Sequence, residues 1–366
     1  MFIVVAVIAA RFVIPLFIPR FPLPAILLCL VVDAADQTIL DTLTTVNLDG
    51  YQSYDKALDI FYLTIAYLAV IRNWTNGFAV DIARFLWYFR LIGVFLFEQT
   101  EIRWILFLFP NVFEYFFIAY EAVNVRWDPR RLTRRALVGL TAFIWVFIKL
   151  PQEWWIHIAQ NDFTDFMRET VFGVATTATW AEAVTNRPAV TAALIAAVGL
   201  LLFAGWTVWR HLPDADWPTR FAATPMWTAP PAAATTNDHQ PPMRWPIFEK
   251  VVLIGLVSSI FATMLDIGAA GHQIVIATVA VVGGDALLSW ALTRHQITWK
   301  HSATEFVAVS ALNTAIITGC AMLMRADALN VTAGLFFGIL LAVIVVLFDR
   351  YHGARHRRQI AVVSSS

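Results

Sequence analysis

The sequence predicts an all-α, polytopic integral membrane protein with about eleven transmembrane helices. Of its 366 residues, 59% are hydrophobic and only 14% are charged, whereas soluble domains are about 25% charged. Apolar stretches of about 17–22 residues, long enough for a helix to cross a bilayer core, recur along nearly the whole chain. Pro, Gly and Arg residues separate these stretches, as is typical of the ends of membrane helices.

Hydropathy and helix breakers together give the predicted spans in order. They are 2–19, 24–41, 56–72, 80–98, 103–122, 136–151, 189–209, 247–268, 272–292, 304–324 and 330–348. The first span is interrupted by Arg11 and lacks a basic segment before it, which indicates a retained helix and not a cleaved signal peptide. The tight turn at 19–22 makes the first two spans antiparallel neighbours, and a short connection does the same for the second and third.

Two later spans contain helix breakers. The fifth contains Pro110 and Asn111, and the ninth contains Gly283, Gly284 and Asp285. Broken helices of this kind can expose backbone groups to a substrate, although a kink filled by neighbouring side chains is the commoner explanation. In the last span, the GxxxG pattern at 334–338 favours close helix packing.

Composition divides the chain into four parts. We expect a front membrane bundle of about seven helices at 1–210, a Pro/Ala/Thr-rich linker at 211–246, a rear bundle of about four helices at 247–350 and a basic tail at 351–366. Within the front part, residues 152–188 place Trp and Phe among polar residues and predict an amphipathic stretch at the membrane interface.

Arginine positions predict the orientation. Five arginines precede the sixth span and four follow the last: Arg126, Arg130, Arg131, Arg134, Arg135, Arg350, Arg355, Arg357 and Arg358. Both places should be cytoplasmic, so an odd number of spans puts the N-terminus outside. We expect a multi-pass protein of the cell (plasma or inner) membrane.

Several function classes find no support. Lys+Arg and Asp+Glu are equal at 26 each, which gives no global attraction to nucleic acid. Cys29 and Cys320 both lie in apolar stretches and indicate core residues, not a disulfide or metal site. The chain has no HExxH, GxSxG, P-loop, dinucleotide fingerprint or CxxC motif.

Four aspartates form the candidate site. Asp33 and Asp36 lie three residues apart near the end of the second span, and Asp55 and Asp59 lie four apart at the start of the third. Each pair shares a helix face, and the antiparallel helices bring both faces to one end. Four carboxylates packed together repel unless protons, a basic partner or a cation neutralises them. Oxygen ligands of this type suit a divalent cation such as Mg²⁺ or Mn²⁺.

Residues near the aspartates complete the candidate set. Gln37 lies close to the Asp33 face, Tyr62 continues the Asp59 face by one turn, and Arg11 or Lys56 would offset a substrate's negative charge. An interfacial helix N-terminus would explain Asp55 without a site, but not Asp33, which should lie well inside the bilayer.

The spacing Asp33-x2-Asp36-x18-Asp55-x3-Asp59 resembles the four-aspartate motif of the CDP-alcohol phosphotransferases. The resemblance covers about residues 8–72, and the family's Gly and Ala-Arg after the second aspartate are missing here. It implies that Asp33, Asp36 and Asp55 hold divalent metal and that Asp59 is the catalytic base that activates an acceptor hydroxyl.

Two arginines fall within spans and need partners. The turn at 19–22 puts Arg11 at a depth similar to that of Asp33, so we expect Arg11 to reach Asp33 or Asp36. Arg90 is predicted to pair with Glu114, an arrangement that would fix helix packing. Arg90, Glu114 and Asp285 are secondary site candidates.

Three functions remain open. The first is a divalent-metal-dependent membrane enzyme that acts on a phosphate-linked lipid. The second is a cation- or proton-coupled transporter that uses the same carboxylates, with the fifth and ninth spans as gates. The third is a structural or assembly protein whose charges only pair helices.

Overall fold

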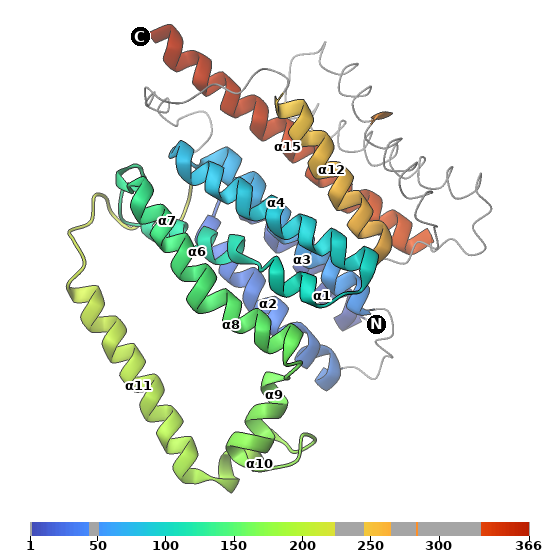
Figure 1. Cartoon of the computed structure of the whole chain (residues 1–366), viewed down its shortest axis with the longest axis vertical. Coiled ribbons are helices and arrows are strands. Elements are labelled where there is room, and N and C mark those ends of the chain that lie inside the picture. The colour runs from blue at the N-terminus through green and yellow to red at the C-terminus, as the bar shows by residue number, and fades with distance from the viewer. Residues whose placement is uncertain (1, 44–50, 224–244, 265–282, 285–330, 366) are drawn as a thin grey trace.

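The structure, a computed structural model, describes residues 2–43, 51–223, 245–264, 283–284 and 331–365. All regular secondary structure in these described ranges is helical. Figure 1 shows the helices arranged as one elongated bundle from which α11 stands apart.

The first helices build the centre of this bundle. They are α1 (Phe2–Val13), the short η1 (Ile14–Phe17), α2 (Pro22–Leu43), α3 (Tyr51–Asn73) and α4 (Gly77–Thr100). Nearly every side chain of α3 from Ala57 to Ile71 is buried, on all faces of the helix. A helix that is apolar all round belongs in a core, and α3 is accordingly surrounded by α1, α2, α4, α12 and α15.

In the fifth span the structure shows the broken helix, and not the kink that is the commoner explanation for such helix breakers. Helix α5 (Trp104–Leu108) ends at Phe109, and α6 (Val112–Asn124) begins after Asn111. Pro110 between them has no amide hydrogen, so the helical hydrogen-bond ladder cannot run through it. Gly93 of α4 lies against this break, where an added Cβ would come within 2.2 Å of the Cβ of Phe109.

The sixth span is longer than expected. Segments α7 (Arg134–Phe143), η3 (Ile144–Lys149), α8 (Leu150–Glu153) and η4 (Trp154–Ile158) follow one another without interruption. The π-helical geometry of η3 and η4 flanks Pro151, whose missing amide disturbs the regular hydrogen-bond pattern.

Residues 152–188, predicted to be amphipathic, continue as short helices with exposed aromatic side chains. They are α9 (Phe163–Phe166), η5 (Met167–Phe172) and α10 (Trp180–Asn186). Exposed Phe163 and Trp180 fit an interfacial position. Helix α11 (Pro188–Arg210) follows and buries none of its apolar span against the rest of the molecule.

The helices after the Pro-rich segment pack onto the first ones. Helix α12 (Trp245–Met264) lies against α4 and α3, and α15 (Val331–Ser365) lies against α3 and α12. Their buried side chains belong to the same hydrophobic core as those of α3 and α4. The described parts on the two sides of the Pro-rich segment thus share one core, as Figure 1 shows.

The chain segments that meet at one end of the bundle are rich in arginine. We call this the basic end: the turn at 19–22, residues 72–76, the loop 124–135 with η2 (Pro129–Arg131), and residues 210–223. Asn76 Nδ2 donates to the Pro129 carbonyl (3.2 Å), and Arg72 Nη1 donates to the Pro19 carbonyl. Helix ends far apart in sequence therefore lie together.

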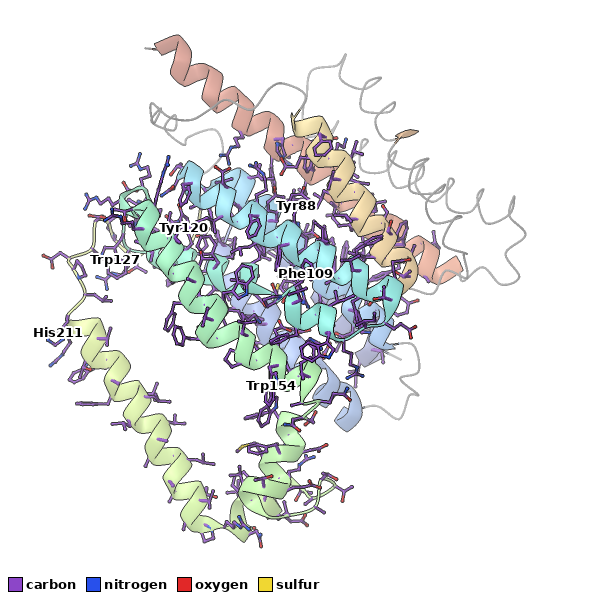
Figure 2. All side chains as sticks on the ribbon, viewed as in Figure 1. Tyr88, Phe109, Tyr120, Trp127, Trp154 and His211 are labelled. Carbon is purple, nitrogen blue, oxygen red and sulfur yellow. The ribbon has the colours of Figure 1, made fainter. Side chains whose placement is uncertain are left out.

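Residues 213–223, which we call the strap, are held against the basic end by hydrogen bonds. The Asp216 amide donates to the Arg126 carbonyl (2.9 Å), the Arg220 amide to the Val125 carbonyl (3.0 Å) and the Ala223 amide to the Arg20 carbonyl (2.8 Å). Figure 2 places Trp127 and His211 at this same end. The first part of the predicted linker is therefore fixed, whereas 224–244 lie outside the described residues.

Within the described ranges, four helical stretches are long and apolar enough to cross a membrane: 104–124, 134–158, 188–208 and 333–353. This is fewer than the eleven spans expected. Two predicted spans, 272–292 and 304–324, fall almost wholly outside the described residues. Helices α2, α3 and α4 are long enough, but they carry the charged residues that converge inside the bundle.

Candidate functional site

The candidate site lies where three helices present charged side chains to one another. Arg11 comes from α1, Asp33 and Asp36 from α2, and Asp55 and Asp59 from α3. Residues three or four apart lie on one face of a helix, so each aspartate pair points in one direction. The three helices pack directly together, which brings both pairs to the guanidinium of Arg11.

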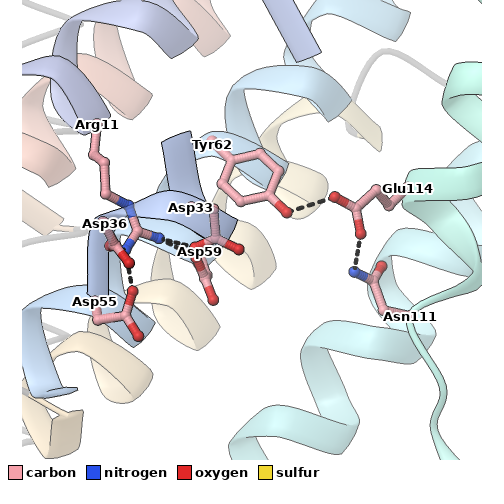
Figure 3. A network of polar contacts seen from close by, with 8 residues as sticks. All are labelled: Arg11, Asp33, Asp36, Asp55, Asp59, Tyr62, Asn111 and Glu114. Atoms are coloured by element: carbon pink, nitrogen blue, oxygen red, sulfur yellow. Dashed lines mark hydrogen bonds and ion pairs between the residues drawn. The ribbon is translucent and has the colours of Figure 1, made fainter. Parts of the chain in front are cut away.

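All four aspartates accept hydrogen bonds from Arg11 (Figure 3). Nη2 donates to Asp33 Oδ1 and to Asp59 Oδ1, each at 2.5 Å, and Nη1 donates to Asp36 Oδ2 and to Asp55 Oδ1. The predicted pairing of Arg11 with Asp33 or Asp36 is confirmed, and it extends to both aspartates of α3. We call these five residues the aspartate cluster.

Burial divides the cluster into an inner and an outer part. The side chains of Arg11 and Asp36 are 4% and 5% exposed, whereas those of Asp33, Asp55 and Asp59 are 32%, 35% and 39% exposed. The three outer residues each offer a carboxylate oxygen, and these oxygens lie within 4.8 Å of one another. The outer part could therefore hold a metal ion, while Asp36 lies behind it against Arg11.

The charges within the cluster do not balance. One guanidinium faces four carboxylates, so three negative charges remain if all four are ionised. Close carboxylates in a medium of low dielectric constant repel strongly unless protons or a cation reduce this charge. The arrangement is therefore one that a cation or protons would stabilise.

Tyr62 leads from the cluster to a second polar group. It lies one turn beyond Asp59 on α3, and its hydroxyl donates to Glu114 Oε1 of α6 (2.5 Å). Asn111 Nδ2 donates to the other oxygen of Glu114 (2.9 Å), and the Asn111 amide donates to Glu153 Oε1 (3.1 Å). Figure 3 shows Tyr62 turned toward Glu114, so its hydroxyl is engaged there.

The predicted pairing of Arg90 with Glu114 is wrong. Arg90 Nη1 instead donates to the Phe109 carbonyl (3.1 Å), because the break between α5 and α6 frees that carbonyl from the helical ladder. Glu114, 5% exposed, takes its hydrogen bonds from Tyr62 and Asn111.

Near the same break, Lys149, Glu153 and His157 do come together, as their spacing predicts. Glu153 Oε2 lies 3.0 Å from His157 Nε2, and Lys149 Nζ lies 3.9 Å from Glu153 Oε1. Lys149 and Glu153 are both buried, so this group belongs to the interior of the bundle.

Of the remaining candidates, only Lys56 has a described side chain. Lys56 is exposed, and its ammonium group lies 6.0 Å from the centre of the Phe97 ring. The side chain of Gln37 and the whole of Asp285 lie outside the described residues.

Two buried acids, Glu121 and Glu249, were not predicted from the sequence. Glu249 of α12 accepts hydrogen bonds at Oε1 from the Tyr67 hydroxyl and from Arg84 Nε (3.1 Å). His352 of α15 lies 3.7 Å from its other oxygen. An acid in an otherwise apolar span was the available signal, because such a residue needs partners.

Comparisons with protein-family models, with curated proteins and with solved structures find no match to this chain. The resemblance to the CDP-alcohol phosphotransferases therefore stays a prediction from the aspartate spacing.

Proposed function

We propose that the protein is a membrane enzyme that binds a divalent cation, Mg²⁺ or Mn²⁺, on the aspartate cluster and acts on a phosphate-linked group of a lipid. The observation that carries the proposal is the convergence of Asp33, Asp55 and Asp59, whose oxygens lie within 4.8 Å of one another on the outer part of the cluster. The ligand set becomes Asp33, Asp55 and Asp59, because Asp36 is buried against Arg11.

The surroundings of the three carboxylates support cation binding. Arg11 neutralises only one of the four negative charges and orients every carboxylate by a hydrogen bond. Hard divalent cations prefer carboxylate oxygens and keep some water ligands, which the exposed outer part allows. The cation would polarise phosphate oxygens of the substrate.

Asp59 has two proposed roles, because one carboxylate oxygen would bind the cation and the other would act as the base; its side chain is the most exposed of the aspartates in the cluster. An acceptor hydroxyl or water would give its proton to the carboxylate of Asp59 while its oxygen forms a new P–O bond. The old P–O bond breaks, and the leaving group departs with its electron pair. A phosphate of a lipid headgroup would reach this site from the membrane surface.

The proposed membrane arrangement has eleven spans, the N-terminus outside and the basic end in the cytoplasm of a plasma or inner membrane. The arginine-rich turns that gather at the basic end support it. Asp33 is eleven residues from the start of α2, and Asp59 is fourteen residues from the end of α3. At 1.5 Å per residue these aspartates lie about 16–21 Å from the basic end, nearer to the opposite surface.

Metal binding by the purified protein tests the proposal. We expect Mn²⁺ to bind, measured by the loss of the free Mn²⁺ signal in electron paramagnetic resonance. Asp33→Asn, Asp55→Asn and Asp59→Asn should each weaken binding by about tenfold or more. Asp214→Asn, which changes an exposed aspartate of the strap, is the matched control. Equal binding in all four variants, or none in the wild type, would overturn the divalent-cation site and leave a proton-coupled or a helix-pairing role for the cluster.

The reaction has its own test. The protein with Mg²⁺ is incubated with vesicles of a total lipid extract, and phosphorus NMR is used to detect new phosphate-containing products. Asp59→Asn should remove the products while the variant keeps its thermal melting midpoint. Identical spectra with and without the wild-type protein would count against an enzyme of this class.

A cation- or proton-coupled transporter is the second candidate, and the broken helix favours it. Charged side chains bind the backbone groups at the break between α5 and α6. Arg90 donates to the Phe109 carbonyl, and Glu153 accepts from the backbone N–H of Asn111. Transporters place such breaks beside substrates and ions. In proteoliposomes, Glu153→Gln should then slow cation-driven flux, which an enzyme would not show.

A further inference from the structure

We infer that the basic end binds anionic lipid headgroups through exposed arginines that the strap brings together. The arginines come from distant parts of the chain: Arg20 from the turn after η1, Arg130 and Arg131 from η2, Arg134 and Arg135 from the start of α7, Arg210 from the end of α11 and Arg220 from the strap. All seven are exposed.

Acidic partners account for two of these arginines. Asp128 pairs with Arg130 at 2.8 Å, and Asp216 pairs with Arg131 at 2.7 Å. Arg20 donates from Nη1 to the Ala223 carbonyl (2.7 Å). In the described part of the chain, no carboxylate pairs with the other four, Arg134, Arg135, Arg210 and Arg220. Among the described residues, the basic end therefore carries a positive charge that neighbouring carboxylates do not compensate.

Aromatic rings hold several of these guanidinium groups. Arg210 lies over the Trp206 ring at 3.9 Å from its centre, Arg220 over Trp217 at 4.1 Å and Arg134 over Phe78 at 5.2 Å. A guanidinium on an aromatic face keeps its N–H groups free at its edge, where they can bind phosphate oxygens. Indoles also favour the headgroup layer of a bilayer.

The strap makes this surface one site instead of separate residues. Trp217 Nε1 donates to the Asn124 carbonyl (3.2 Å) and Trp127 Nε1 to the Pro213 carbonyl (3.3 Å). The backbone amide of Arg220 also donates to the Val125 carbonyl. Together these hydrogen bonds fix Arg220 next to the loop that leads into α7. The arginines meet at helix ends, which is the level of lipid phosphates in a bilayer. Their occupant is therefore the headgroup of an anionic phospholipid.

Lipid titration of the detergent-purified protein tests the inference. Phosphatidylglycerol or phosphatidylcholine is added at increasing concentration, and the thermal melting midpoint reports binding. We expect phosphatidylglycerol to raise the midpoint, with a smaller effect in high salt because exposed charges are screened. Phosphatidylcholine should have little effect.

Variants locate the binding. Arg134→Gln, Arg135→Gln and Arg220→Gln should each weaken the apparent affinity for phosphatidylglycerol about fivefold. Arg220→Lys should keep most of it, because the charge remains and the backbone hydrogen bond of residue 220 is unchanged. Arg103→Gln is the matched control, since Arg103 is exposed beyond the far end of α4.

Three outcomes would overturn the inference: equal affinity in the Arg134, Arg135 and Arg220 variants, equal effects of the two lipids, or full reproduction of the effect by free glycerol phosphate. The last would indicate a site for soluble phosphates. None of these variants touches the aspartate cluster, so this test and the Mn²⁺ test fail independently.

Discussion

At the residue scale, Arg11 is the centre of the aspartate cluster. It is 5% exposed and donates to four carboxylates on two other helices. A buried guanidinium satisfied in this way joins α1, α2 and α3 by charge-assisted hydrogen bonds. The same residue thus fixes helix packing and sets the charge of the candidate cation site.

Removing Arg11 should be costly. We expect Arg11→Gln to reduce the free energy of unfolding by about 3–5 kcal/mol, because four carboxylates lose the buried guanidinium that donates to all of them. Thermal or urea unfolding in detergent measures the change. Adding Asp36→Asn should restore part of the loss, since Asp36 is the most buried aspartate of the cluster. An Arg11→Gln protein as stable as the wild type would contradict the pairing.

Asp128 gives a pH-dependent prediction outside the membrane spans. Hydrogen bonds from Arg130 hold the pKa of Asp128 below its usual value. A lowered folded-state pKa stabilises the protein above the unfolded pKa of about 3.9, and this stabilisation is lost as the pH falls through the folded pKa. Because Arg130 is half exposed, the effect should be about 0.5 kcal/mol. The difference in melting midpoint between wild type and Asp128→Asn should therefore shrink between pH 6 and pH 3.

Individual residues show how far the sequence can predict the site. The meeting of Arg11 with Asp33 and Asp36 could be predicted, because a tight turn fixes the relative depth of two neighbouring helices. The direction of the Tyr62 side chain could not be predicted from the sequence. Its helix face lies between the cluster and α6, and only the packing of the helices decides whether Tyr62 contacts the cluster or α6. Arg90 was misassigned because the carbonyl that it binds becomes free only once the helix breaks at Pro110.

At the element scale, the break between α5 and α6 is held by side chains from two neighbouring helices. Arg90 of α4 satisfies the Phe109 carbonyl, and Glu153 of α8 satisfies the Asn111 amide. Since Pro110 is a local signal, the break itself could be predicted from the sequence. The packing of α12 and α15 on α3 could not, because it joins segments separated by most of the chain.

Gly93 should be required for this packing. We expect Gly93→Ala to reduce the free energy of unfolding by about 1–3 kcal/mol, because the new methyl group overlaps Phe109 and forces the break to move. Gly139→Ala on α7 is the matched control, since nothing lies within 4 Å of its added Cβ. There the change should stabilise the helix by up to about 1 kcal/mol. Urea unfolding of both variants in detergent distinguishes a steric effect from helix propensity. Equal changes in the free energy of unfolding would argue against the close contact between residue 93 and Phe109.

At the scale of the whole molecule, the basic end and the aspartate cluster lie at different levels along the helix bundle. The all-helical class followed from composition and segment length, which bilayer thickness constrains directly. Helices that bury charged residues inside a bundle are less apolar than typical membrane spans, so segment length and helix breakers predict them as spans whereas hydropathy alone does not. Helices α2, α3 and α4 are of this kind.

The orientation can be tested by labelling in whole cells. In a Cys320→Ser background, an impermeant maleimide should label Arg103→Cys from outside and label Arg131→Cys only after lysis. Both positions are exposed, while Cys29 is buried and should stay unlabelled. Labelling of Arg131→Cys in intact cells would invert the proposed orientation and put the outer part of the cluster on the cytoplasmic side.

The isolation of α11 has a mechanical consequence. Because this helix buries none of its span against the other described residues, packing within the described part of the chain does not fix its tilt. Its tilt is then set by the thickness of the surrounding hydrocarbon, at a cost of fractions of a kcal/mol per Å of mismatch. Its C-terminal end continues into the strap, which is bonded to the turn between η1 and α2. A thinner or thicker bilayer would thus act as a small force on the turn whose two helices carry Arg11 and Asp33.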